Sequence, residues 1–142
     1  AQTPEIAQGG NRVRVIAGEV EGIRGPVTEI AADPTYLDVT VAPQTSFVHP
    51  VARGHSAFAY VFEGAGVFGR GATPTAATRL LILSDGDYLE VRTNDAPVRF
   101  LLVSGKPLYE PIARYGPFVM NTRAEIEQAL RDLQNGTFVT PT

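Results

Sequence analysis

The sequence contains no cysteine, which excludes disulfide bonds, thiolate metal sites and cysteine nucleophiles. It also has no apolar run approaching the roughly 18–20 residues of a transmembrane helix, so no membrane contact is expected. Histidine is scarce, with only two residues in the whole chain. A metal centre built from several imidazoles therefore has few ligands to draw on.

Positive charge is in slight deficit. Twelve Lys and Arg stand against fifteen Asp and Glu, which gives a net charge of -3 and a pI of about 5.3. No basic field is available to hold a phosphate backbone, so direct binding of nucleic acid is not expected. The 142 residues, 44% hydrophobic and 19% charged, suit one globular domain with a buried core.

The first ten residues, AQTPEIAQGG, have the Pro, Gln and Gly content of a linker. Since the chain starts with Ala1 rather than Met, we expect residues 1–10 to be a remnant left by cleavage. Removal of a signal peptide would leave such a remnant, and so would a cut between two domains. The first origin corresponds to a secreted one-domain protein, the second to a fragment of a larger one.

Most of the chain consists of short segments with apolar residues at alternate positions, separated by turn signals. In RVRVIAG (12–18), Val13 and Val15 share one face of an expected strand. Further strands are expected at 27–31, 35–41, 46–50, 57–64, 67–69, 79–87, 88–95 and 97–105. The apolar runs RLLIL (79–83) and RFLLV (99–103) predict strands buried on both faces. This spacing is typical of an all-β sandwich or barrel.

Two motif-like stretches lack the context that their chemistry needs. GAGVFG (64–69) has G-x-G-x-x-G spacing, but no helix follows it, so its glycines predict a hairpin and not a nucleotide site. SDGDYLE (84–90) carries three carboxylates, which we interpret as solvated side chains of a hairpin turn rather than a calcium loop.

One helix is expected, at 121–136, followed by a tail at 137–142. Thr122 and Glu125 have the spacing of a capping box, and Asn135-Gly136 supplies a stop signal. Ile126, Ala129, Leu130 and Leu133 form one apolar stripe, while Glu127 and Arg131 form an i,i+4 pair on another face. The stripe must be buried against the β-domain, expected at 11–120, or against a partner.

The two histidines offer a weak metal hypothesis. His49, His55 and Glu63 could form a facial triad on paper, but the six-residue histidine spacing crosses a proline and a glycine. The alternative interpretation places His55 at a strand edge and His49 in a loop, without a metal.

Several segments together resemble the C-terminal half of the pirin family, two-domain proteins of the cupin superfamily. They are RVRVIAGEVEGIRGPV (12–27), TYLDVTV (35–41), RGHSAFAYVFEGAG (53–66), FLLVSGKPLYEPIARYGPFVMNT (100–122) and QNGTF (134–138). The resemblance spans residues 9–138. It implies a double-stranded β-helix, the cupin jelly roll, with one C-terminal α-helix.

The resemblance also implies an iron site of three histidines and one glutamate in the N-terminal half of the family, outside this chain. Aligning YVFEG (60–64) with the related N-terminal motif places Pro50 and Ala52 at two histidine positions and Ser56 at the glutamate position. Aligning Gly86-Asp87 with the second motif places Arg99 at the last histidine position. We therefore expect no metal, cofactor or catalytic residue in this chain.

The resulting hypothesis is a non-catalytic, structural and partner-binding cupin domain of a cytoplasmic pirin-like protein. Pirins are associated with quercetin 2,3-dioxygenase activity and with regulatory binding to proteins. The expected partner is the N-terminal cupin half or a second copy of this chain, with a regulatory protein as a further partner. Interface candidates are Tyr109, Tyr115 and Phe118 in the aromatic tail and Ile126, Leu130 and Leu133 in the helix; packing within this domain is the alternative. The competing hypothesis is a self-sufficient small-molecule-binding or metal-dependent cupin enzyme.

Overall fold

The computed structural model describes residues 2–139, which divide into two compact units, the first ending at Pro107 and the second beginning at Leu108. The first unit contains β1 (Glu5–Gln8), β2 (Asn11–Ala17), β3 (Glu19–Val20), β4 (Ile23–Arg24), β5 (Thr35–Val41), β6 (Ser46–Pro50), β7 (Ser56–Phe68), β8 (Thr75–Ala76), β9 (Arg79–Ile82), β10 (Tyr88–Arg92) and β11 (Val98–Gly105). The second contains β12 (Ala113–Tyr115), β13 (Phe118–Met120) and α1 (Arg123–Asn135). Residues 108–120, which we expected in the β-domain, thus group with the helix.

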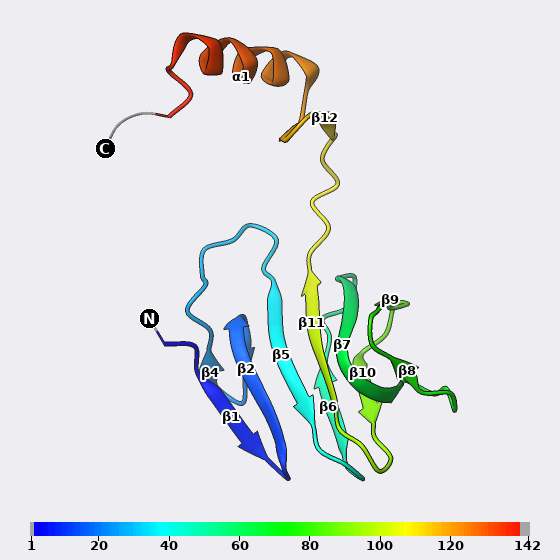
Figure 1. Cartoon of the computed structure of the whole chain (residues 1–142). Coiled ribbons are helices and arrows are strands. Elements are labelled where there is room, and N and C mark those ends of the chain that lie inside the picture. Colours follow the sequence, from blue (N-terminus) through cyan, green and yellow to red (C-terminus); the bar gives the residue numbers. More distant parts are fainter. Residues whose placement is uncertain (1, 140–142) are drawn as a thin grey trace. The chain divides into compact units, whose positions relative to one another are not determined.

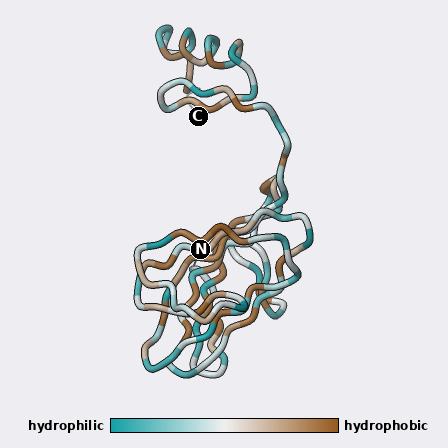
Figure 2. The backbone as a smooth tube through the Cα atoms, turned by 90° about the vertical axis from the view of Figure 1, so that its right-hand side faces the viewer, coloured by the Kyte–Doolittle hydropathy of each residue, from teal (hydrophilic) through white to brown (hydrophobic). Residues whose placement is uncertain are grey.

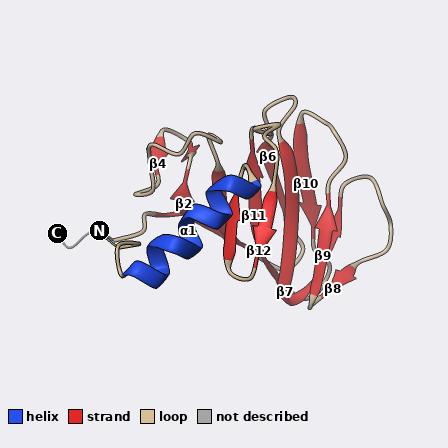
Figure 3. Ribbon diagram, turned by 90° about the horizontal axis from the view of Figure 1, so that it is seen from above, coloured by secondary structure: helices blue, strands red, loops and turns tan. Residues whose placement is uncertain are grey.

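The first unit is built on one curled antiparallel sheet with the strand order β1-β2-β5-β11-β7-β10-β6 (Figure 1), to which β8 and β9 add by pairing with β7. The long strand β7 pairs with β11 along most of its length and with β10 through Val67 and Phe68. Gly64 and Gly66 therefore lie within β7, where the sheet turns, and not at the tip of the hairpin that the sequence predicted. The curl brings β6 and β10 opposite β2 and β11 (Figure 3).

The space between these layers is a closely packed apolar core. Alternate residues of β2, β5 and β11 point into it, as the period-two patterns predicted. Phe47 of β6 meets Phe100 of β11 edge-on, with ring centroids 6.1 Å apart. The core residues are Val13, Val15, Leu37, Val39, Val41, Phe47, Ala59, Val61, Leu89, Val91, Val98, Phe100 and Leu102. Figure 2 shows hydrophobic and hydrophilic residues interspersed along the tube of the first unit.

Two strand predictions were wrong. Residues 27–31 form no strand beyond a single bridge between Ala17 and Val27, because Glu29 has a left-handed backbone with φ of 62°. The run 79–83 is not buried on both faces: Leu80 is 57% exposed and Ile82 75% exposed. Within the described chain, β9 pairs with β7 alone, so its side chains lie at an edge of the sheet.

The second unit is a β12–β13 hairpin against which α1 packs. Thr122 and Glu125 form the predicted capping box, and Gly136 ends the helix in a left-handed conformation with φ of 69°. The polar pairing differs from the prediction, because Glu127 pairs with Arg123 while Arg131 donates a hydrogen bond to Gln128. No helix in residues 2–139 is long and apolar enough to cross a membrane.

Candidate functional site

The four positions aligned with the pirin iron ligands do not converge in the structure. Pro50, Ala52 and Ser56 are exposed, and Arg99 is half-buried on the outer face of the sheet. Arg99 donates two hydrogen bonds to Asp38, of 2.9 and 2.6 Å, and its guanidinium lies 4.9 Å from the centre of the Phe62 ring. It thus belongs to a charged cluster outside the core.

The orientation of β6 and β7 explains this dispersion. On β6 the inward side chains are Phe47 and His49, while on β7 they begin with Ala57. Pro50 directly follows the inward residue His49, and Ser56 directly precedes the inward residue Ala57. Because successive strand residues point to opposite faces, Pro50 and Ser56 point outward.

The second candidate set, His49, His55 and Glu63, is also not brought together. His49 lies in β6 and is only 6% exposed, whereas His55 lies in the loop before β7, so the predicted loop and edge locations of the two histidines were reversed. Glu63 is exposed near the end of the β7–β11 pairing, opposite Arg99. Among the described residues, no group of three His, Cys, Asp or Glu side chains has an arrangement that could hold a metal ion.

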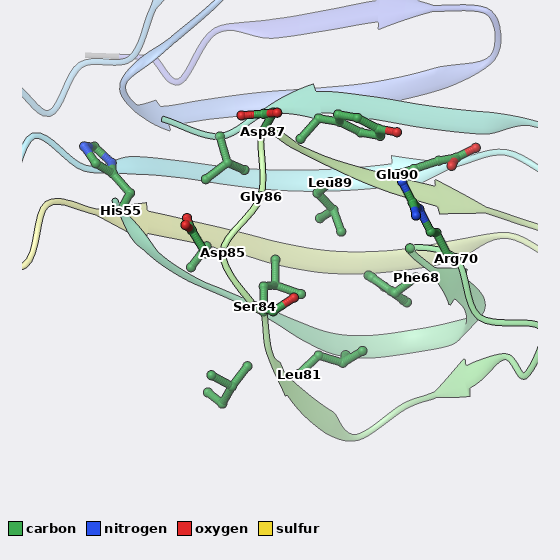
Figure 4. A pocket seen from close by; sticks show the side chains of 16 residues that line it. His55, Phe68, Arg70, Leu81, Ser84, Asp85, Gly86, Asp87, Leu89 and Glu90 are labelled. Atoms are coloured by element: carbon green, nitrogen blue, oxygen red, sulfur yellow. The ribbon is translucent and has the colours of Figure 1, made fainter. Parts of the chain in front are cut away.

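His55 instead lines a cavity of about 620 Å³ beside β7, β9 and β10 (Figure 4). Its apolar wall includes Phe68, Leu81 and Leu89. In Figure 4, His55, Asp85 and Asp87 gather at one end and Arg70 and Glu90 at the other, with Leu89 and Phe68 between them. A cavity of this volume, with apolar walls and a few polar groups, has the character of a small-molecule site.

The acidic end of this cavity is partly neutralised. Arg53 donates hydrogen bonds of 2.6 and 3.1 Å to the two carboxylate oxygens of Asp87, and this pairing raises the pKa of Arg53. Within residues 2–139, the carboxylate of Asp87 is thus hydrogen-bonded to Arg53 and not to His55. The carboxylates of Asp85 and Asp87 can offer hydrogen-bond acceptors to a ligand in this cavity.

The outer face of the sheet carries a feature that the sequence analysis missed. One cross-strand row runs Tyr36, Val103, Phe58, Ile82, and a second runs Leu101, Tyr60, Leu80. Phe58 and Tyr60 are each 36% exposed, and the ends of both rows on β9 are more exposed still. The available signal was the segment AFAYVF (57–62), whose small residues point inward and whose aromatic residues point outward.

The six predicted interface residues have mixed environments within the second unit. Tyr109 and Tyr115 are 91% and 63% exposed, and Phe118 is half-buried against Phe138 with ring centroids 5.4 Å apart. Ile126 is buried, Leu130 is half-buried and Leu133 is 56% exposed.

Comparison with known proteins gives a consistent family. The profile described as the pirin C-terminal cupin domain matches residues 36–139. A pirin-like protein of Solanum lycopersicum is 40% identical over 136 residues, which cover 94% of this chain and 46% of that protein. A putative quercetin 2,3-dioxygenase of Pseudomonas aeruginosa is 41% identical over 133 residues, covering 90% of this chain and 46% of that protein.

A solved structure agrees with this result. The crystal structure of a quercetin 2,3-dioxygenase from Acinetobacter baumannii superposes with a TM-score of 0.86 at 34% identity, covering 97% of this chain and 48% of that one. The chain therefore spans about half the length of the relatives it matches. The cupin fold, the strand order and these matches together identify the chain as a member of the pirin family, corresponding to its C-terminal cupin domain.

Proposed function

We propose that this chain is a non-catalytic cupin domain that serves as the structural and partner-binding half of a pirin-like protein. The observation that carries the proposal is the filled interior. Phe100, Leu37 and Leu102 are fully buried between the two layers, and valines occupy most of the remaining inward positions. His49 is the one imidazole among the buried residues described, and a single inward imidazole does not make the ligand set of three histidines and a carboxylate that such an iron site needs.

In this proposal the iron and any oxygen chemistry belong to the N-terminal half of the parent protein. Several relatives are named quercetin 2,3-dioxygenases, and each is about twice as long as this chain. A half without ligands of its own would stabilise the other half and present surfaces to it.

The surface that we assign to the partner is the outer sheet face formed by the two cross-strand rows. Solvent-exposed Phe58, Tyr60, Leu80 and Ile82 lie side by side on β7 and β9. Contiguous exposed apolar side chains on a strand face are typical of an interaction site. We assign this face to the N-terminal cupin half because the matched relatives contain a further segment of similar length.

Two measurements test this function. After incubation with Fe²⁺ and removal of free metal, we expect no stoichiometric iron and no consumption of quercetin by the isolated chain. About one tightly held iron per chain would contradict the non-catalytic assignment.

The partner surface is tested with the N-terminal half supplied as a separate polypeptide. Tyr60→Asp should weaken association, whereas Val48→Asp, at a 58% exposed position on β6, should not. Equal effects of the two substitutions would contradict the assignment of this face to the partner. Sedimentation of the chain alone would detect self-association through the same face.

The second candidate function is small-molecule binding in the His55 cavity, favoured by its apolar walls and polar ends. A ligand whose binding is lost in His55→Ala, without any effect of Tyr60→Asp, would support that alternative.

A further inference from the structure

A separate cavity of about 290 Å³ lies beside β6, where β1, β2 and the β3–β4 hairpin approach it. Its lining includes the buried residues Val13, Phe47 and His49. Ile6 of β1 and Val20 of the hairpin are half-buried against the same core and complete an apolar wall. The volume is at the lower end of the range for small-ligand sites, which suits a compact molecule with one ring.

The imidazole of His49 is the polar group at the buried side of this cavity. The residue is only 6% exposed, and within residues 2–139 no hydrogen bond to another group reaches its ring. Within residues 2–139, every fully buried side-chain nitrogen or oxygen has a hydrogen-bond partner. Because the imidazole nitrogens of His49 have none, they are not fully buried and keep some accessible surface. His49 lines the cavity, and a ligand there can therefore reach these atoms.

Burial also determines what this imidazole can do. Desolvation lowers the pKa of His49, so at neutral pH the ring is uncharged and offers one N–H donor and one nitrogen acceptor. A ligand hydroxyl can exchange a hydrogen bond with such a ring. A neutral hydroxyl is also much less costly to bury beside Phe47 and Val13 than an ammonium group is.

The outer part of the cavity, in contrast to its apolar buried side, is acidic. Glu19 and Glu21, from the β3–β4 hairpin, line it and are exposed. Glu19 pairs with Arg24 at 2.7 Å, while no ion pair of Glu21 occurs among the described residues. Neither Lys nor Arg belongs to the lining within that same part of the chain. The rim therefore favours a cationic group over an anionic one.

We propose that the His49 cavity is a binding site for a compact hydroxylated aromatic amine, whose hydroxyl group bonds to His49 and whose ammonium group faces the Glu21 carboxylate. The ring of the ligand lies against Ile6, Val13 and Val20 in this arrangement. The site requires no metal and is distinct from the His55 cavity and from the outer sheet face.

Tyramine is a suitable probe, with two comparison compounds that each change one group. Phenethylamine lacks the hydroxyl group, and 4-hydroxyphenylacetate replaces the ammonium group by a carboxylate. Titration is followed by NMR of the histidine ring protons, in which the His49 signals report on this cavity and the His55 signals report separately on the other one. We expect tyramine to shift the His49 signals saturably and to bind about tenfold more tightly than either comparison compound.

Two variants separate the contributions of the polar groups. His49→Phe retains a ring of similar size and should abolish the preference for tyramine over phenethylamine. Glu21→Gln should weaken both amines while preserving that preference. Glu127→Gln makes the same charge change on α1, in the other unit. It should alter neither the affinity for the two amines nor the preference for tyramine.

If His49→Phe fails to fold, titration of the wild-type chain with the three compounds still tests the proposal. The absence of saturable His49 shifts up to about 10 mM tyramine would overturn the proposal. Equal binding of 4-hydroxyphenylacetate, or an unchanged tyramine preference in a folded His49→Phe protein, would overturn it as well.

Discussion

The imidazole ring of His49 lies almost parallel to the ring of Phe47, with centroids 6.2 Å apart and planes inclined by 4°. Both residues point inward from β6, two positions apart. Phe47 in turn meets Phe100 edge-on, and Phe100 meets Phe68 with centroids 5.1 Å apart. These four rings form an aromatic cluster in the interior of the domain. Its one titratable residue, His49, is kept neutral by burial.

This burial predicts a specific dependence of stability on pH. Because the pKa of His49 is lowered in the folded chain, the unfolded chain binds a proton more readily as the pH falls below the ordinary histidine value of about 6.5. The free energy of unfolding should be fully retained above that value and should fall as the pH drops through the folded pKa. The matched comparison is His49→Phe, which keeps the carboxylates Glu19 and Glu21 but removes the titration.

Urea unfolding at about pH 7.5 and at about pH 5 measures this effect. We expect the stability of the wild type, relative to His49→Phe, to be lower at the acidic pH. The same difference at both pH values would mean that His49 does not titrate differently in the two states.

Phe100 should be among the most sensitive core positions. It is 0% exposed and contacts Phe47 and Phe68 from the opposite layer of the sheet. Phe100→Ala should lower the free energy of unfolding by about 3–5 kcal/mol. Leu80→Ala, at a 57% exposed edge position, should cost below about 0.5 kcal/mol. Comparable losses would show that the edge strand is as well packed as the core.

The parts of the fold that the sequence predicted are those in which local chemistry and burial agree. The alternation in β2 and β5 identifies the inward residues, and the Thr122–Glu125 capping box marks the start of α1. The run 79–83 misled the prediction because apolar content does not distinguish a central strand from an edge strand. Whether residues 79–83 form a central or an edge strand depends on which strands pair with them, and this is set by the long-range pairing with β7.

The candidate site was harder to predict, for a physical reason. Which face of a strand is buried depends on register, and a shift by one residue reverses every side chain. His49 and Pro50 are adjacent in the sequence, yet the first is buried and the second exposed. Likewise, the alternation of alanines with Phe58 and Tyr60 on β7 fits either orientation until β11 and β9 are in place.

Gly64 should tolerate no side chain. Its φ of 71° is left-handed, and an added Cβ would fall on the carbonyl oxygen of Pro97 on the neighbouring chain segment. Gly64→Ala therefore requires β7 and β11 to separate locally, and we expect a cost above about 3 kcal/mol. At Gly54, φ is 77° but nothing lies within 4 Å of an added Cβ, so Gly54→Ala should cost only about 1–2 kcal/mol of backbone strain. Thermal unfolding of the pair checks this, and equal losses would mean that steric overlap at Gly64 is relieved without cost.

The helix stripe should be energetically uneven. Ile126 is 5% exposed, whereas Leu133 is 56% exposed. Because the chain has two compact units, local exchange of the α1 amide hydrogens is a better measure than global unfolding. Ile126→Ala should lower the protection of α1 by about 2 kcal/mol or more, and half-buried Leu130→Ala by less. Leu133→Ala should change it by less than about 0.5 kcal/mol, unless a partner covers this residue.

The Arg99–Asp38 pair should be a measurable ion pair on the outer face of the sheet. Two hydrogen bonds of 2.9 and 2.6 Å join them, the Asp38 side chain is 13% exposed, and the pairing raises the pKa of Arg99. A double-mutant cycle should give a coupling of about 0.5–1.5 kcal/mol at low salt, smaller at about 1 M NaCl because partial exposure of Arg99 permits screening. Arg99→Lys should lose most of this coupling, since an ammonium group cannot make the paired contacts of a guanidinium.

The matched comparison is Arg24–Glu19, which also has a short contact, of 2.7 Å, but whose side chains are 79% and 47% exposed. We expect no measurable coupling there, because water competes for both charged groups. If the two cycles gave the same coupling, burial of Asp38 between β2 and β11 would not strengthen the Arg99 pair.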